Sequence, residues 1–429
     1  MRKAIIAVFG LGLLAHLAIF GLALGNDQTF FYDDDSAGYL TLAENMQSGN
    51  GFSWNTEAPY APNSFRTPGY PAFLLAHRAL FGSSVPALVT QIGLALLIAW
   101  LVYRLGARFF SARLGLIATG IFLAMPFSLL VPEQYLTQVL FTALVMGAVW
   151  YWLEALGGRW KYAALAGILL ALAVLVRPIA QFLPAAFIAS AVFASAVRSL
   201  SWQKATGMSL ILIVLFIAGI APWAIRNDAV FGRLALSSLV PSQLYFYDGP
   251  SIYATAHDVS YDEARVALVE RIEAVTHISV SENYESYIQF SPITDTLTAE
   301  GKKNALADIP ALIETRTLQF FKFFVRDGTR TFLEPYGISY TSGPGLAAAL
   351  AERTALGILM IGFFTMAIVG VMRKSAATVA MTLVVLYFAA LTGVMGAAGF
   401  RYPAEPLFIL LGVAGIFELY TLLRTRIRV

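Results

Sequence analysis

Long apolar runs separated by polar segments dominate the chain. The first run, residues 4–25, follows Arg2 and Lys3, and a helix of about 20 apolar residues is long enough to cross a bilayer. Pro126 and Pro178 fall inside or beside later runs, where proline breaks or kinks a helix. The pattern predicts ten membrane-spanning helices, at residues 4–25, 85–103, 114–131, 136–156, 162–176, 179–197, 207–224, 345–372, 376–397 and 404–423.

The first apolar run has two interpretations. A cleaved signal peptide also begins with basic residues, but its apolar core is usually about 7–15 residues long. Residues 4–25 exceed that length. We therefore expect a retained membrane anchor.

Basic residues indicate the orientation, because Lys and Arg are retained on the cytoplasmic side. With the N-terminus inside, 14 of the 29 basic residues lie at cytoplasmic helix ends. The opposite face receives two long segments, 26–84 and 226–344, which hold 6 and 15 of the 26 acidic residues. We expect both to be external loops. Helical patterning appears from Ala37 to Met46 in the first, and at 261–275 and 303–326 in the second.

Composition agrees with an all-α polytopic membrane protein that forms one membrane domain, residues 1–429. Hydrophobic residues make up 58% of the chain and charged residues 13%, with a mean hydropathy of +0.69, whereas soluble proteins are about a quarter charged. The chain has no cysteine, which excludes disulfides and thiolate metal sites. A net charge of +3 with scattered basic residues does not indicate a nucleic-acid partner.

Charged residues at membrane depth are costly and therefore mark candidate functional positions. On the predicted outer face, Asp33, Asp34 and Asp35 directly follow the first span and its short connection. Four more charged residues reach the same face at the ends of other spans: Glu133, Arg177, Arg226 and Arg401. Acids beside several arginines are suited to activating a hydroxyl group and binding a phosphate.

Each of these features also has a simpler interpretation. Three adjacent aspartates alone are more often a solvated turn or a helix cap than a catalytic site. Arginine, tryptophan and tyrosine are common at the headgroup level, and Gly69 and Pro71 are typical of a turn. The four histidines lack metal-ligand spacing, and the chain contains no P-loop, zinc-protease or Rossmann motif.

The order of short motifs resembles a known family. Asp35-x-x-x-Tyr39, then Gly49-x-Gly51-Phe52, then Arg66-x-Pro68-Gly69-Tyr70-Pro71 are similar to the first external loop of polytopic glycosyltransferases of the C superfamily (GT-C). The bacterial protein-mannosyltransferase-like group, which includes lipid A aminoarabinose transferases, is the most similar. Further matches are Val176-Arg177-Pro178, Pro222-Trp223-Ala224-Ile225-Arg226-Asn227 and Arg401-Tyr402-Pro403. The resemblance spans nearly the whole chain.

The resemblance implies a GT-C fold and an enzyme that moves a sugar, with inversion, from a polyprenyl-phosphate-linked donor to an acceptor on the outer face. Asp35 takes the position of the general base, and Asp34 and Glu133 are expected to be supporting acids. If a divalent metal cation binds, its candidate ligands are Asp34, Asp35 and Glu133, and no nucleotide or organic cofactor is expected. The expected contacts to the donor phosphate and sugar are Arg66, Arg177, Arg226, Arg401, Tyr39, Tyr70 and Tyr402. The implied location is the bacterial inner membrane.

Two departures from the family pattern bear on the metal. Many members have a second acid directly after the catalytic aspartate, where this chain has Ser36, and a Thr-Glu pair where it has Thr137-Gln138. Glu133 lies one helical turn earlier and is a candidate substitute. Metal dependence and the acceptor, whether glycan, lipid or protein, stay open, although segment 226–344 is expected to shape the acceptor side.

Two other functions remain as alternatives. Ten spans with charged residues at membrane depth also suit a transporter or lipid flippase. Against that function, the sequence shows no repeat of one half in the other, and the acids cluster on one face. The second alternative is a ligase of whole lipid-linked oligosaccharides.

Overall fold

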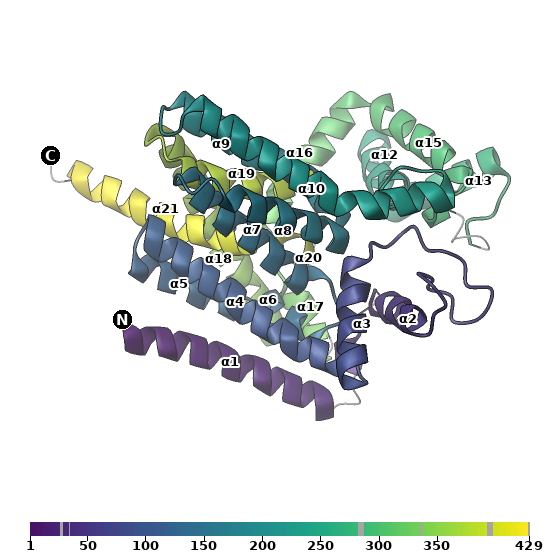
Figure 1. Ribbon diagram of the computed structural model, residues 1–429, viewed down its shortest axis with the longest axis horizontal. Coiled ribbons are helices and arrows are strands. Elements are labelled where there is room, and N and C mark those ends of the chain that lie inside the picture. The colour runs from purple at the N-terminus through teal and green to yellow at the C-terminus, as the bar shows by residue number, and fades with distance from the viewer. Residues whose placement is uncertain (26–28, 34, 282–286, 335–336, 393–397, 428–429) are drawn as a thin grey trace.

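The computed structural model describes residues 1–429 except 26–28, 34, 282–286, 335–336, 393–397 and 428–429. Its regular elements are helices throughout this described part of the chain. The long apolar helices lie side by side (Figure 1). The first helix begins and the last helix ends at one end of the bundle, and the helices of the two segments predicted to be external, 26–84 and 226–344, lie at the other. This arrangement confirms the expected all-α polytopic fold.

Each predicted span coincides with a helix or a helix pair over its described residues, and residues 393–397 of the span predicted at 376–397 lie outside them. In the described residues seven helices are long and apolar enough to cross a membrane, or eight if one bent pair forms a single span, so the count of ten is not confirmed. The two remaining predicted spans are shorter apolar helices, α8 (Tyr162–Val176) and α19 (Ala376–Leu391). The long helices are α1 (Arg2–Gly25), α4 (Val85–Phe109), α7 (Gln138–Leu156), η3 with α9 (Pro178–Phe182 and Leu183–Ala196), α10 (Trp202–Phe231), α18 (Gly343–Met372) and α21 (Glu405–Ile427).

The bent pair forms where Pro126 was expected to break a helix. Helix α5 (Ala112–Ala124) ends there, and α6 (Pro126–Leu130) with η2 (Val131–Glu133) continues at an angle of 67°. Proline has no N–H to donate, so it is favourable at the first turn of a new helix. The bend carries Glu133 into the interior of the bundle, where its side chain is completely buried.

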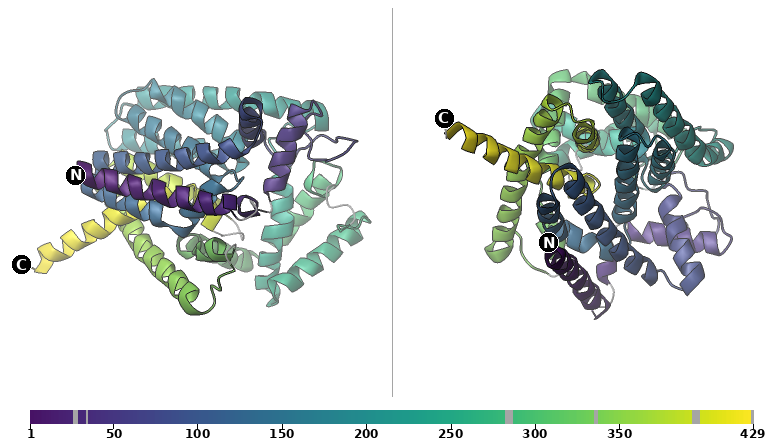
Figure 2. Two further views of the ribbon diagram at one scale, coloured as in Figure 1. Left: turned by 90° about the horizontal axis from the view of Figure 1, so that it is seen from below. Right: turned by 60° about the vertical axis from the view of Figure 1, so that its left-hand side comes forward.

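Glycines bring two pairs of spans into close contact. A Cβ atom on Gly362 of α18 would lie 2.0 Å from the carbonyl oxygen of Gly412 in α21, and one on Gly106 of α4 would lie 2.3 Å from Cα of Gly115 in α5. Small residues allow membrane helices to approach at backbone distance. Helix α1, by contrast, lies along the outside of the bundle (Figure 2), with most of its side chains exposed.

The first external segment contains two helices. Helix α2 (Ser36–Gln47) matches the predicted helix within one residue at each end. Helix α3 (Gly69–Phe81) begins at Gly69, where the sequence had suggested only a turn, and ends at Gly82 with a left-handed φ of 70°. Between them, residues 52–66 form an irregular loop across the end of the bundle.

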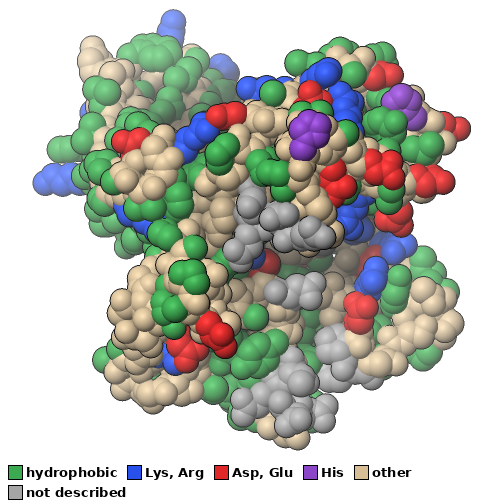
Figure 3. All heavy atoms as spheres, turned by 90° about the vertical axis from the view of Figure 1, so that its right-hand side faces the viewer, with side chains coloured by type: hydrophobic (Ala, Val, Ile, Leu, Met, Phe, Trp, Pro, Cys, Tyr) green, Lys and Arg blue, Asp and Glu red, His purple; other side chains and the backbone are tan. Residues whose placement is uncertain are grey.

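The second external segment has its own small apolar core around Tyr245, Leu268, Ile272 and Leu297. The helix predicted at 261–275 is α13 (Tyr261–Thr276), but the patterned stretch 303–326 is divided at Asp308, whose side chain caps a new helix that has Pro310 in its first turn. The other helices of this segment are α11 (Leu239–Gln243), η4 (Leu244–Asp248), α12 (Gly249–His257), α15 (Ile293–Ala307), α16 (Ile309–Val325) and α17 (Thr329–Leu333). Acidic and basic side chains are spread over this face (Figure 3).

Candidate active site

Arg66 is the centre of the candidate site. Its Nη2 donates to Oδ1 of Asp35 at 2.5 Å, and its Nη1 donates to the hydroxyl of Tyr39 at 3.0 Å. The guanidinium also lies over the rings of Tyr39 and Phe65, at 4.7 and 4.9 Å from their centroids. The Arg66 side chain is 17% exposed and the Asp35 side chain 52%. One arginine thus joins the predicted base to a buried tyrosine, and the carboxylate remains open to solvent.

The start of α2 places Asp35. The backbone N–H of Asp33 donates to Oγ of Ser36 at 2.9 Å, and that hydroxyl donates to the carbonyl oxygen of Tyr135 at 3.2 Å. Tyr135 in turn donates its N–H to the carbonyl oxygen of Phe31 at 3.0 Å. Asp35 occupies the N-cap position of α2, but its side chain makes no capping bond. The carboxylate is therefore directed to Arg66 rather than used as a helix cap.

A close backbone approach brings Arg177 to the same place. A Cβ atom on Gly69 would lie 2.7 Å from the carbonyl oxygen of Leu175 at the end of α8. The hydroxyl of Thr67 donates to the carbonyl oxygen of Val176 at 3.2 Å. Only glycine allows this distance, because any other residue would clash with the α8 backbone. These contacts place the loop that carries Arg66 next to Arg177.

Arg177 extends toward the start of α7. Its Nη1 donates to Oγ1 of Thr137 at 3.0 Å, and its charge interacts with Asp35, Tyr39 and Arg66. Two arginines and one carboxylate therefore share the site. Their net positive charge suits an anionic group such as a phosphate.

Two tyrosines form the floor of the site. The rings of Tyr39 and Tyr70 meet edge to face at 5.1 Å, and the Tyr70 hydroxyl donates to Gln91 Oε1 at 2.8 Å. Gln91 is buried, and its amide donates to the carbonyl oxygens of Pro132 and Gln134. Burial raises the pKa of Tyr39 above its ordinary value, and the nearby Arg66 partly offsets this effect. Tyr39 is therefore neutral at physiological pH.

Glu133 lies in a different environment from Asp35. Its Oε1 is 2.9 Å from Nδ1 of His16 in α1, and both side chains are buried. Its other oxygen has no hydrogen-bond partner among the described residues. The predicted supporting acid thus pairs with a histidine that lies within the first predicted span, residues 4–25.

Arg401 and Tyr402 form a second buried group. Nε of Arg401 donates to Oε2 of Glu405 at 3.0 Å, and Nη1 donates to the carbonyl oxygen of Arg326 at 2.5 Å. Arg401 is 1% exposed, and Tyr402, packed against Phe127, is completely buried. A buried ion pair of this kind is costly to break, about 3–5 kcal/mol when one partner is removed. Arg401 is thus paired with Glu405 inside the bundle.

Arg226 holds the first external loop. Its Nη1 donates to the carbonyl oxygen of Asn63 at 3.0 Å and to the side chain of Asn227 at 2.8 Å. Its guanidinium also faces the ring of Trp223 at 4.8 Å. Asn63 then accepts a hydrogen bond from the backbone N–H of Arg66 at 2.9 Å. Arg226 thus supports the site through the backbone that carries Arg66.

The described part of the chain contains no group of side chains that could coordinate a divalent cation. No group of three histidine or acidic side chains is arranged to hold one, and Asp34 lies outside the described residues. Glu133 is paired with His16. The described residues therefore do not fit a metal site.

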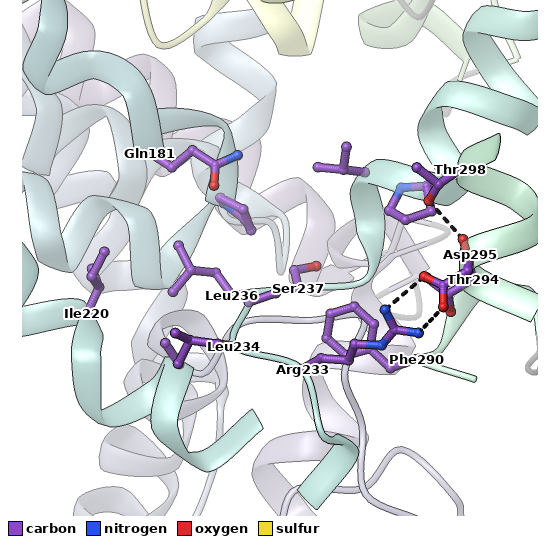
Figure 4. Close-up of a pocket in the computed structure, with 15 residues that line it drawn as sticks. Gln181, Ile220, Arg233, Leu234, Leu236, Ser237, Phe290, Thr294, Asp295 and Thr298 are labelled. Atoms are coloured by element: carbon purple, nitrogen blue, oxygen red, sulfur yellow. Dashed lines mark hydrogen bonds and ion pairs between the residues drawn. The ribbon is translucent and has the colours of Figure 1, made fainter. Parts of the chain in front are cut away.

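A cleft of about 490 Å³ opens beside the site, between η3, the end of α10 and α15 (Figure 4). Its walls are mostly apolar, and include Ile220 and Leu236. Arg233 and Asp295 pair through two hydrogen bonds at its edge, 2.8 and 2.5 Å long. The hydroxyl of Ser237 in the cleft wall donates to the carbonyl oxygen of Phe65 at 2.6 Å. The cleft and the Arg66 loop are therefore in direct contact.

Several site residues had no role in the sequence analysis. Gln91 is a polar residue within a predicted span, and that position was the available signal. Thr137 had been noted only as part of the Thr137-Gln138 departure from the family pattern. Glu405 lies four residues after Arg401, the spacing of an ion pair on one helix face. His16 inside an apolar run was a signal of the same kind.

Comparison with known proteins supports the resemblance seen in the sequence. Residues 66–225 match the model of a family described as dolichyl-phosphate-mannose-protein mannosyltransferase. That match begins at Arg66 and includes Glu133 and Arg177. A comparison with curated protein sequences finds no match.

Solved structures extend the resemblance to the fold. The Archaeoglobus fulgidus oligosaccharyltransferase in the apo form is 15% identical, with a TM-score of 0.57 over 98% of this chain and 52% of that one. The oligosaccharyltransferase AglB from the same organism, in complex with an inhibitory peptide and a dolichol-phosphate, is 15% identical, with a TM-score of 0.52 over 98% of this chain and 51% of that one. ArnT from Cupriavidus metallidurans bound to undecaprenyl phosphate is 13% identical, with a TM-score of 0.43 over 95% of this chain and 78% of that one. The chain spans about half the length of the oligosaccharyltransferase, and the expected GT-C fold is confirmed.

Proposed function

We propose that this integral membrane protein is a GT-C glycosyltransferase that moves a sugar from a polyprenyl-phosphate donor to an acceptor on the outer face of a bacterial inner membrane. The single observation that carries the proposal is the cluster of Asp35, Arg66 and Arg177 at the bundle end that bears both external segments. The match of residues 66–225 to a dolichyl-phosphate-mannose-dependent family supports the class of donor.

Asp35 is the proposed general base. Its half-exposed carboxylate accepts the proton of the acceptor hydroxyl as that oxygen forms a bond to the anomeric carbon. The bond from the anomeric carbon to the phosphate oxygen breaks on the opposite face, so the configuration inverts and polyprenyl phosphate leaves. A carboxylate within hydrogen-bond reach of the hydroxyl is the group that this step requires.

Arg66 and Arg177 are the proposed phosphate ligands. Both are permanently charged and present planar sets of donors that match phosphate oxygens. When the donor binds, its phosphate replaces Asp35 as an acceptor for Arg66 and frees the carboxylate for the acceptor hydroxyl. Tyr39 and Tyr70 line the sugar side, and segment 226–344 forms the acceptor side.

Arg226, Arg401, Tyr402 and Glu133 have supporting roles in this proposal. Arg226 fixes the loop through Asn63, and Arg401 is neutralised by Glu405 inside the bundle. This division of roles revises the expectation that all four arginines bind the donor phosphate.

The test is Asp35→Asn, which keeps the shape of the side chain and removes its charge. We expect sugar transfer from mannosyl-phosphoryl polyprenols to membrane acceptors to fall by at least about 100-fold, within the range that general-base catalysis contributes, while binding of undecaprenyl or dolichyl phosphate is retained. Transfer would be measured by mass spectrometry of labelled products. Undiminished transfer by the variant would reject Asp35 as the base.

The same assay separates the alternatives. Products enlarged by one sugar support a monosaccharide transferase, and products enlarged by a whole oligosaccharide support a ligase. Movement of the lipid-linked sugar across the membrane of sealed vesicles, without a new glycosidic bond, would support a flippase instead.

A further inference from the structure

The segment that carries Arg66 is held by the second external segment. Ser238 donates its backbone N–H to the carbonyl oxygen of Ser64 at 3.0 Å, and Ser237 donates its hydroxyl to the carbonyl oxygen of Phe65 at 2.6 Å. On the other side, the backbone N–H of Phe290 donates to Oγ of Ser64 at 2.7 Å. Residues separated by more than 170 positions thus fix the two residues that precede Arg66.

Gln289 makes three of these contacts through one atom. Its Oε1 accepts from the backbone N–H of Ser64 at 2.7 Å and from that of Phe65 at 3.2 Å, and the Ser64 hydroxyl lies 2.9 Å away. Two N–H groups directed at one atom identify that atom as the amide oxygen. One half-buried side chain therefore satisfies two consecutive backbone donors of the loop.

These contacts determine where the Arg66 guanidinium lies. Arg66 directly follows Phe65, and its guanidinium lies over the Phe65 ring at 4.9 Å from the ring centroid. The guanidinium then reaches Asp35 and Tyr39 in α2. A shift of the Ser64–Phe65 backbone would displace the guanidinium by a similar distance, and displacements of about 1 Å are enough to weaken an oriented site.

We propose that Gln289 is a positioning residue that orients Arg66 for the donor phosphate by holding the backbone of Ser64 and Phe65. The inference rests on the proposed function, because it takes Arg66 as a phosphate ligand. Through Gln289, the second external segment completes a site whose charged groups lie on the first.

The wall of the cleft contains two of the same contacts. Ser237 and Phe290 line the cleft and also hold Phe65 and Ser64. Figure 4 shows both residues beside the Arg233–Asp295 pair. Gln289 immediately precedes Phe290, so the residue that positions Arg66 is the direct chain neighbour of a residue in the cleft wall.

The test compares three variants of the full-length protein in detergent. Gln289→Leu removes the acceptor at nearly constant volume, and Gln289→Glu retains an oxygen that accepts the same two N–H groups. Gln181→Leu is the matched control, because Gln181 lines the cleft from η3. Hydrogen exchange at Ser64 and Phe65 reports on the contact, and the Kd for undecaprenyl phosphate reports on the position of Arg66.

We expect Gln289→Leu to accelerate exchange of both amides by at least tenfold and to raise the Kd for undecaprenyl phosphate about three- to tenfold. Gln289→Glu restores both values toward those of the wild type, and Gln181→Leu changes neither. Rescue by the glutamate variant distinguishes positioning from a general loss of folded protein. Arg66→Ala in the same titration shows how much affinity the positioned side chain contributes.

Each contrary result has a distinct meaning. Unchanged exchange in Gln289→Leu would overturn the contact, and accelerated exchange with an unchanged Kd would overturn its positioning role. A wild-type protein that does not bind undecaprenyl phosphate would reject the proposed donor class and the positioning role with it, whereas the exchange rates would still decide the contact.

Discussion

At the scale of single residues, the candidate site depends on the geometry of one guanidinium. Arg66 donates from two nitrogens to two different side chains, Asp35 and Tyr39. A lysine has a single ammonium group on a flexible chain and does not reproduce this fork. A positive charge alone therefore does not reproduce the two hydrogen bonds that Arg66 makes.

Arg66→Lys tests this dependence. We expect the Kd for undecaprenyl phosphate to rise about tenfold, equivalent to about 1.4 kcal/mol, because the ammonium group cannot contact Asp35, Tyr39 and the phosphate in the same geometry. Isothermal titration in detergent measures the change. Arg78→Lys is the control, since Arg78 joins α3 to α2 through Gln47 and Glu44 at the exposed side. An equal effect of both substitutions would count against a specific role for Arg66.

The sequence predicted part of this residue-scale arrangement. The motif order placed Asp35, Tyr39 and Arg66 in one loop, and these residues do lie together. Glu133 and Arg401 were grouped with them because all were charged and on the same predicted face. Their burial against His16 and Glu405 depends on how helices are rotated about their axes, which hydropathy does not encode. Gln289 carries no motif at all.

At the scale of elements, backbone contacts between helices determine the shape of the bundle. Helices α18 and α21 approach through Gly362, Gly412 and Gly415, where a Cβ atom on Gly415 would lie 1.8 Å from the carbonyl oxygen of Gly362. Such an approach gains dispersion contacts that are the main source of helix association in a bilayer. It also requires that no side chain intervene.

Gly362→Ala tests this contact. The new methyl group must displace the α21 backbone, so we expect a loss of about 1–3 kcal/mol, typical of overpacked interiors, and a lower midpoint of thermal unfolding in detergent. Gly357→Ala is the matched control on the same helix, because nothing lies within 4 Å of its Cβ position. Equal midpoints for the two variants would show that α18 and α21 do not meet at backbone distance.

The helices also show which parts of the fold hydropathy predicts and which it does not. Each of the ten apolar runs became a helix or helix pair, because burial in lipid requires every backbone group to be bonded internally. The bend at Pro126 was expected from chemistry, whereas the new helix at Gly69 was not. Its start depends on contact with Leu175 and Val176 at the end of α8, far away in the sequence. Contact with α8, rather than local sequence propensity, therefore determines that a helix begins at Gly69.

At the scale of the whole molecule, the two segments predicted to be external, 26–84 and 226–344, meet at one end of the bundle. The first contributes Asp35 and Arg66, and the second fixes Arg66 through Ser237, Ser238 and Gln289. The opposite end bears both chain termini (Figure 1). The distribution of basic residues predicted this division, because it requires only the order of the spans and their flanking charges.

Orientation in the membrane can be tested directly, because the natural chain has no cysteine and a single introduced cysteine is then the only thiol. Glu57 and Lys161 are both exposed and lie in segments predicted on opposite sides of the membrane. We expect Glu57→Cys in intact bacterial cells with a permeabilised outer membrane to react with a membrane-impermeant maleimide, and Lys161→Cys to react only after the inner membrane is disrupted. The reverse labelling pattern would place Asp35 on the cytoplasmic face and reject transfer on the outer face.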